Sequence, residues 1–79
     1  MTPHEWVSCY TLLRAAYPSF YRSFGQVDVQ SWYELLRDLD GPLTVFAVGK
    51  LIQTRPYPPS IACIRQQVQD LQQPRREAT

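Results

Sequence analysis

Four stretches of the chain place apolar residues at the three- and four-residue intervals of an amphipathic helix. The first helix is expected to run from Pro3 to about Ala16. Thr2 and Glu5 have the spacing of a capping box at its start, and Pro18 disfavours helical geometry at the residue before it. The apolar stripe of this helix consists of Trp6, Tyr10, Leu13 and Tyr17.

The second helix is expected to run from Val29 to Leu39, with Asp28 as its N-cap. An aromatic connection, YPSFYRSFGQV, precedes it and has room for one helical turn. We expect Phe20 and Phe24 to anchor this connection on the core. The apolar stripe of the second helix consists of Val29, Trp32, Leu36 and Leu39, widened by Tyr33 and Leu35.

The segment from Pro42 to about Thr54 contains LTVFAV, a β-branched and apolar run that alone could form a strand. We expect a helix instead, because the sequence offers no second strand to supply a hydrogen-bonding ladder. The fourth helix is expected to begin after Ser60, a good N-cap, and to end before Pro74. Its stripe consists of Ile61, Ile64, Val68 and Leu71.

These elements predict an all-α fold, a small compact bundle of about four helices. We expect the helical domain to cover residues 1–73 and a flexible tail to cover residues 74–79. A domain of this size buries only about 60% of its unfolded surface, so its stability should be marginal. The centre of the bundle is expected to consist of Trp6, Leu13, Trp32, Leu36, Val48, Ile52, Ile64 and Val68.

Few residues of this 79-residue chain can be spared for a deep cleft, and its net charge of +1 gives no general attraction to nucleic acid or membranes. The only histidine, His4, lies in a first helical turn, and Cys9 and Cys63 lack the spacing of metal ligands. The three glycines are isolated, so no phosphate-binding loop is present. Asp38 and Asp40 are interpreted as solvated charges beside a helix end. We therefore expect no enzyme activity, no cofactor and no metal.

The two cysteines are expected to be reduced thiols, as is usual in the cytosol, but the sequence also allows a disulfide between them. The N-terminus lacks a basic region followed by an apolar run, and no apolar stretch approaches the 18 or so residues of a membrane span. We expect a soluble, cytoplasmic protein that makes no contact with a membrane.

The stretch RPYPPSIA at residues 55–62 concentrates three of the seven prolines within four residues. Proline fixes the backbone, so this segment is expected to be a rigid entry into the fourth helix. It is also a candidate contact surface, because Arg and Tyr are favoured at protein interfaces. The candidate partner-binding residues are Arg55, Tyr57, Pro58, Arg65, Arg75 and Arg76.

A contact with nucleic acid stays open at this point. Residues 20–24 interleave aromatic rings with Arg22, as single-strand binders do, although the same rings are also explained as anchors of the connection. Residues 41–79 carry five basic and two acidic residues, a modest basic excess.

Four pieces of sequence occur in order along most of the chain: AYPSF at residues 16–20, WYELLRD at 32–38, AV and LI within 47–52, and PPSIACIR at 58–65. Together they resemble the N-terminal domain of the phage replicative-helicase loader/inhibitor family. The resemblance implies an all-helical domain and a phage or prophage replication accessory protein. It offers no catalytic residues to carry over.

The resemblance also implies partners. Members of that family bind the hexameric replicative helicase, hold it inactive and deliver it to an origin through a phage initiator protein. A longer C-terminal segment engages the helicase, whereas only residues 74–79 follow the last expected helix here. Either that segment has been lost, or this domain serves another contact, such as the initiator.

The alternative is a small helical DNA-binding regulatory protein of phage origin. A helix-turn-helix reader needs a basic, polar recognition helix. The fourth helix offers Arg65, Gln66, Gln67 and Gln69 for this role.

Overall fold

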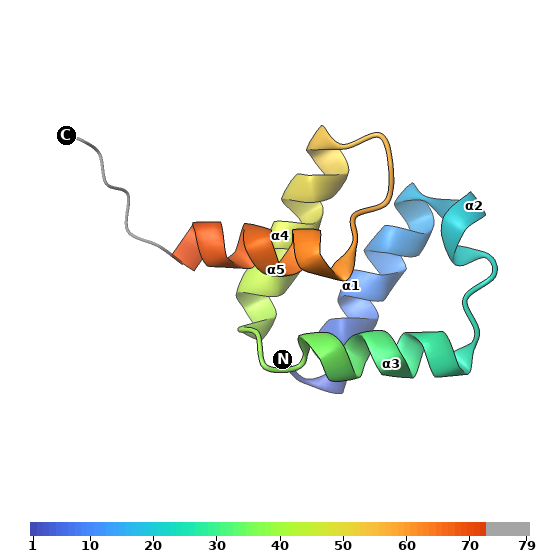
Figure 1. Ribbon diagram of the computed structural model, residues 1–79, viewed down its shortest axis with the longest axis horizontal. Coiled ribbons are helices and arrows are strands. Elements are labelled where there is room, and N and C mark those ends of the chain that lie inside the picture. The colour runs from blue at the N-terminus through green and yellow to red at the C-terminus, as the bar shows by residue number, and fades with distance from the viewer. Residues whose placement is uncertain (73–79) are drawn as a thin grey trace.

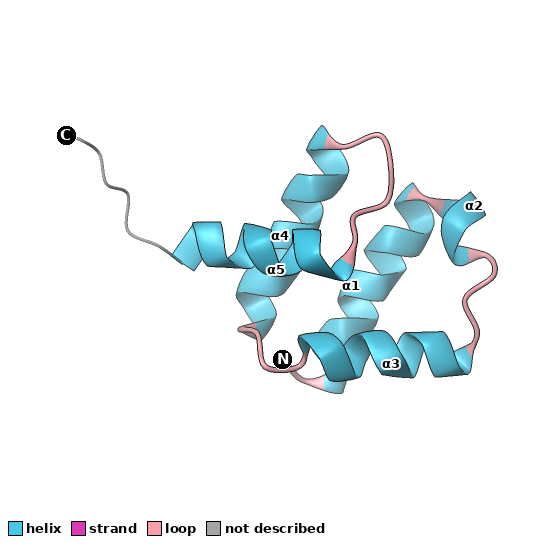
Figure 2. Ribbon diagram, in the orientation of Figure 1, coloured by secondary structure: helices cyan, strands magenta, loops and turns pink. Residues whose placement is uncertain are grey.

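The computed structural model describes residues 1–72, which form five helices joined by short connections (Figures 1 and 2). The helices are α1 (Pro3–Ala16), α2 (Pro18–Tyr21), α3 (Gln26–Leu36), α4 (Gly41–Thr54) and α5 (Ile61–Gln72). This part of the chain contains no strand, so the predicted all-α fold is confirmed. The tail expected at residues 74–79 lies outside the described residues, and the domain boundary at residue 73 stays a prediction.

Helices α1 and α4 lie side by side and run in the same direction (Figure 1). Beside their N-terminal ends, the ammonium group of Met1 donates a hydrogen bond to the carbonyl oxygen of Leu39 at 2.8 Å. At their C-terminal ends, the Tyr17 hydroxyl donates to the carbonyl oxygen of Arg55 at 2.9 Å. Each of these bonds joins residues 38 positions apart in the sequence. The parallel arrangement therefore brings two helix C-termini to the same end of the molecule.

Gly41 permits the close approach of the two helix N-termini. The Glu5 carboxylate occupies the space that a Cβ atom at position 41 would take. The same carboxylate accepts the backbone N–H of Thr2 at 2.8 Å and so completes the expected capping box of α1. A single side chain thus caps one helix and packs against the start of the other.

The core lies between α1, α4 and α5, which crosses α4 in Figure 1. Six of the eight residues expected at the centre are buried there, but Trp32 and Ile52 are only partly buried. Trp32 lies at the rim because α3 covers one side of α1, where its ring stacks on Trp6 with centroids 6.4 Å apart. The buried apolar residues are Trp6, Cys9, Leu13, Tyr21, Leu36, Leu39, Ala47, Val48, Leu51, Ile64 and Val68.

The expected bounds of the second helix are wrong at both ends. Helix α3 begins three residues earlier, because Gly25 is its N-cap and Asp28 accepts the backbone N–H of Gly25 at 2.9 Å from within the first turn. The helix ends at Leu36 rather than Leu39, where the N–H of Leu39 bonds back to the Leu36 carbonyl in a turn. The Met1 ammonium takes up the carbonyls of Arg37 and Leu39 beyond this end.

The aromatic connection does contain one helical turn, α2, but the anchors differ from those expected. Phe20 is 45% exposed, and the neighbouring Tyr21 is buried in its place. Tyr21 makes edge-on contacts with Tyr10, Phe24 and Trp32. Because Phe24 is partly buried, it holds the connection as expected, whereas the ring of Phe20 remains available at the surface.

The two remaining helices follow the sequence closely. The β-branched run is helical in α4, whose N-cap Asp40 accepts the N–H of Leu43 at 2.9 Å. Asp40 is therefore a cap rather than only a solvated charge. In α5, the Ser60 hydroxyl accepts the N–H of Cys63 at 3.1 Å, as expected of an N-cap.

An ion pair joins the end of α3 to α5. Both guanidinium nitrogens Nη1 and Nη2 of Arg65 donate to the Asp38 carboxylate at 2.8 Å, and Nη1 also donates to the Leu35 carbonyl at 2.9 Å. The hydrogen bonds from Arg65 hold the pKa of Asp38 at about 2, below its usual value of 3.8. The interpretation of Asp38 as an unpaired solvated charge is therefore wrong. Its partner comes from 27 residues further along the chain.

Removing the Arg65 side chain should lower stability in a pH-dependent way. The pKa of Asp38 is depressed in the folded state, so the pair contributes stability above about pH 3.8 and loses it as the pH falls toward about 2. We expect Arg65→Ala to lower the thermal midpoint near neutral pH, and the difference from wild type to shrink through this acidic range. Thermal unfolding followed by circular dichroism at several pH values measures both effects.

Arg37→Ala is the matched control for that experiment. Arg37 pairs with Glu34 three residues away on the same surface, and both side chains are more than half exposed. Such a pair contributes little, so this variant should unfold close to wild type. A loss as large as that of Arg65→Ala would show that the contact between α3 and α5 has no special importance.

Tyr21→Phe should leave stability unchanged or raise it by up to about 1 kcal/mol. The Tyr21 hydroxyl is buried without a hydrogen-bond partner, and burial raises its pKa to about 12. Tyr33→Phe is the control, because the Tyr33 hydroxyl donates to the Met1 carbonyl at 3.1 Å and its removal should cost about 1 kcal/mol. Urea titration of both variants measures the difference, and a larger loss for Tyr21→Phe would contradict this account.

Candidate protein-binding surface

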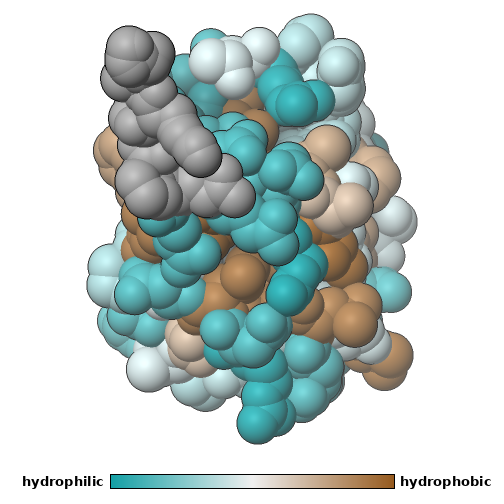
Figure 3. All heavy atoms as spheres, turned by 60° about the vertical axis from the view of Figure 1, so that its left-hand side comes forward, coloured by the Kyte–Doolittle hydropathy of each residue, from teal (hydrophilic) through white to brown (hydrophobic). Residues whose placement is uncertain are grey.

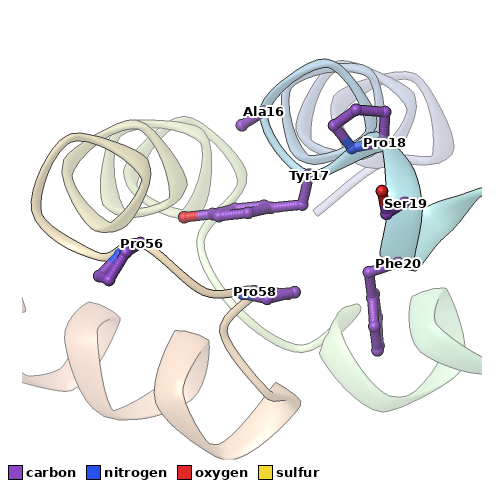
Figure 4. A pocket seen from close by; sticks show the side chains of 7 residues that line it. All are labelled: Ala16, Tyr17, Pro18, Ser19, Phe20, Pro56 and Pro58. Carbon is purple, nitrogen blue, oxygen red and sulfur yellow. The ribbon is translucent and has the colours of Figure 1, made fainter.

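The proline loop, residues 55–60, connects α4 to α5 and lies against the junction of α1 and α2. Between the loop and this junction is a shallow groove of about 300 Å³, here called the loop groove. In Figure 4, Tyr17 extends from the end of α1 toward the loop, and Phe20 lies on the other side of Pro58. The groove is lined by Ala16, Tyr17, Pro18, Ser19, Phe20, Pro56 and Pro58.

The loop groove is held in shape by its own residues. The Tyr17 hydroxyl bonds to the Arg55 carbonyl and fixes the start of the loop, while Pro59 is fully buried at its other end. Burial raises the pKa of Tyr17, an effect that the nearby charge of Arg55 opposes. The hydroxyl therefore stays protonated and remains a donor. Since Pro56 and Pro58 also fix their own backbone angles, the groove needs little ordering before a partner binds.

Arg55 and Tyr57, two of the expected contact residues, are at the surface beside the groove. The Arg55 guanidinium lies 5.9 Å from the centre of the Tyr57 ring, within the range of a cation–π contact. The Tyr57 side chain is 58% exposed. Pro58, the third expected residue of the loop, is partly buried and lines the groove itself. The structure thus brings these three residues together.

The remaining expected contact residues lie elsewhere. Arg65 is taken up by its pair with Asp38 on the side of the molecule formed by α3 and α5, so it does not belong to the proline loop surface. Arg75 and Arg76 lie outside the described residues. Sequence reasoning missed Tyr17, whose apolar spacing placed it in the stripe of α1, and it missed Phe20 as a surface residue.

The segments that build this end of the molecule contain no carboxylate. Residues 6–27 and 41–69 include neither Asp nor Glu, whereas Glu5 and Asp40 lie at the opposite ends of α1 and α4. The basic residues here are Arg14 in the last turn of α1, Arg22 at the C-cap of α2 and Arg55 at the C-cap of α4. Cations at helix C-termini favour the helix dipole, so this distribution stabilises the fold as well as giving one end a positive charge.

A second exposed area lies on the outer side of α3. Val27 is 78% exposed and Leu35 is 56% exposed, although Leu35 was expected to widen the buried stripe. A shallow hollow of about 330 Å³ is lined there by Gln26, Val27, Gln30 and Ser31. On α4, Phe46 is 56% exposed with the Lys50 ammonium 5.8 Å from its ring. On the face shown in Figure 3, hydrophilic side chains interrupt the exposed apolar ones.

The chemistry of the other candidate groups is limited. Cys9 and Cys63 are both free thiols, so the disulfide left open by the sequence is not formed. Burial raises the pKa of Cys9 to about 11, while hydrogen bonds from Ser60 lower the pKa of Cys63. Among residues 1–72, no three His, Cys, Asp or Glu side chains are grouped as metal ligands. No helix in this range combines the length and apolar character needed to cross a bilayer.

Comparison with known proteins identifies the family. No curated protein and no solved structure matched the chain. Residues 1–65 match the family model for the N-terminal domain of the phage helicase loader/inhibitor proteins, a range that covers α1 to α4, the proline loop and the first turn of α5. This range includes all four sequence pieces on which the resemblance rests and all of the loop groove. The chain therefore belongs to the phage helicase loader/inhibitor family and is a phage helicase-associated protein.

Proposed function

We propose that this domain is a phage DNA-replication accessory module that binds the replicative helicase or the phage initiator protein and catalyses no reaction. The observation that carries the proposal is the family match over residues 1–65. The absence of a metal-ligand group among residues 1–72 is consistent with it but adds no support of its own. The module would act in the cytoplasm of the bacterial host, where phage replication proteins assemble.

The proline loop surface is the proposed contact, defined as Arg55, Tyr57 and the residues that line the loop groove. Tyr and Arg are among the residues most often found at the energetic centre of protein interfaces. The prolines on both sides of Tyr57 restrict its backbone, so little entropy is lost when it docks. The outer side of α3 offers exposed apolar side chains but no fixed loop and no arginine in α3 itself.

The initiator is the favoured partner of the folded domain. The resemblance assigns helicase binding to a segment that follows the last helix, which leaves the helical domain for a different contact. The loop groove lies within the part of the chain that matches the N-terminal family model. One chain could then connect the initiator, through this domain, to the helicase.

The alternative function, reading of duplex DNA by α5, has lost its main support. Arg65 is the only Lys or Arg in α5, and it is paired with Asp38. The other polar residues of α5 are glutamines and Asp70, and the Asp70 carboxylate accepts a hydrogen bond from Gln66. A recognition helix without an available cation would bind the phosphate backbone poorly.

The double substitution Arg55→Ala with Tyr57→Ala tests the proposed contact. Loss of two central interface residues should weaken binding to the initiator or the helicase by about tenfold or more, which corresponds to about 1.4 kcal/mol. The thermal midpoint should stay near wild type, because Tyr57 is exposed and the Arg55 carbonyl that Tyr17 needs is retained. Isothermal titration calorimetry with each purified protein measures the affinity.

Val27→Ala with Leu35→Ala is the matched control for this experiment, since it truncates two exposed side chains on α3. It should leave the affinity unchanged. If only the α3 variant loses binding, the contact surface is on α3 and the proline loop is merely a spacer. If neither the initiator nor the helicase binds the wild-type chain, the proposed function itself is wrong.

A further inference from the structure

The walls of the loop groove suit one apolar side chain in an extended chain. Phe20 and Pro58 present ring surfaces to it, with Tyr17 and Pro56 completing the lining (Figure 4). A volume of about 300 Å³ lies at the lower limit for small-molecule sites but is ample for a proline or leucine side chain. Grooves lined by aromatic rings are a recurring means of binding extended, proline-containing segments.

The groove offers a ligand few hydrogen bonds. The Tyr17 hydroxyl is already engaged with the Arg55 carbonyl, which leaves the Ser19 hydroxyl as the other polar side-chain group of the lining. A polar small molecule would therefore lose hydrogen bonds to water without replacing them. The groove favours an apolar group whose polar backbone stays at the open side.

The charge around the groove indicates what should lie beside that apolar group. Arg22 follows the wall formed by α2, and Arg55 precedes the wall formed by the loop. Neither arginine is in an ion pair within residues 1–72, and the two surrounding segments, 6–27 and 41–69, contain no carboxylate. Carboxylates of a bound chain would find attraction here and no repulsion.

We propose that the loop groove binds an extended acidic segment of the partner protein, with one proline or leucine side chain placed between Phe20 and Pro58 and flanking carboxylates beside Arg22 and Arg55. This inference rests on the proposed function and specifies the chemistry of the partner that this surface recognises. The charge complementarity selects the segment, and the rigid groove fixes its position.

Single-stranded nucleic acid fits the same surface less well. Sequence-tolerant binding of single strands uses a series of exposed aromatic faces along a basic track. Of the five aromatic residues from Tyr17 to Phe24 and in the loop, only Phe20 and Tyr57 are exposed, and Tyr21 is buried. Two arginines beside one groove are enough for a short acidic segment, but they give little affinity for a chain of phosphates.

Binding of synthetic peptides to the full chain tests the inference. The probe is a fluorescent peptide with a central Leu-Pro pair flanked on both sides by glutamates, and the comparison peptides carry lysine or glutamine in place of glutamate. Fluorescence anisotropy should show binding of the glutamate peptide that weakens as salt is added. The lysine peptide should not bind, and the glutamine peptide should bind at least about tenfold more weakly than the glutamate peptide.

Two variants of equal net charge locate the site. Arg22→Gln with Arg55→Gln should weaken binding of the glutamate peptide at least about tenfold, whereas Arg37→Gln with Lys50→Gln should leave it unchanged. Phe20→Ala should weaken binding of the glutamate and glutamine peptides alike, since it removes an apolar wall. Equal binding of all three peptides, equal loss in both charge variants, or displacement of the peptide by oligothymidylate at equal concentration would overturn the inference.

The same variants separate this inference from the proposed function. If the glutamate peptide fails to bind while Arg55→Ala with Tyr57→Ala still loses the initiator or the helicase, the function stands and the acidic segment is wrong. If the peptide binds at the loop groove while neither replication protein binds, the inference about the groove stands and the proposed function falls.

Discussion

The parallel packing of α1 against α4 is the constraint on which the rest of this small domain depends. Contacts at both ends of the pair fix it, with Met1 and Glu5 at the N-terminal ends and Tyr17 at the C-terminal ends. Antiparallel neighbours would place one N-terminus and one C-terminus at each end. Here both C-termini lie together, so the cations that favour each helix dipole also lie together, and the capping carboxylates Glu5 and Asp40 lie at the other end.

This arrangement links the stability of the fold to the proposed contact. The chain must leave α4 at the same end at which it left α1, so the proline loop passes the junction of α1 and α2. One hydrogen bond, from Tyr17 to Arg55, then converts a connection into one wall of a groove. The result is a rigid, basic and partly apolar surface, which suits a protein that brings other proteins together.

Local signals in the sequence were sufficient for the elements and insufficient for the contacts between them. Capping at Thr2, Asp40 and Ser60 and the apolar spacing of three stretches predicted α1, α4 and α5 nearly to their ends. The start of α3 was misplaced, because Asp28 fits an N-cap and a third helical position equally well. Sequence spacing also identified the proline loop as a rigid candidate surface.

The site could be predicted only in part, because its decisive contacts are long-range. Arg65 lies off the buried stripe of α5, and nothing local shows that Asp38 is its partner. Tyr17 continues the apolar spacing of α1, so its hydrogen bond to a carbonyl 38 residues away cannot be read from periodicity. Tyr21 and Phe20 are adjacent and both aromatic, and the packing of α2 alone decides which is buried. Contacts of this kind depend on how helices are arranged in space.

Mapping of amide chemical shifts tests most directly whether the end formed by the C-termini of α1 and α4 is the functional surface. The chain labelled with ¹⁵N would be titrated with the unlabelled initiator and, separately, with the helicase. The account predicts that the largest changes for at least one of them fall on residues 16–20 and 55–58, with residues 26–31 of α3 unaffected. Changes concentrated on α3, with the proline loop unaffected, would contradict it.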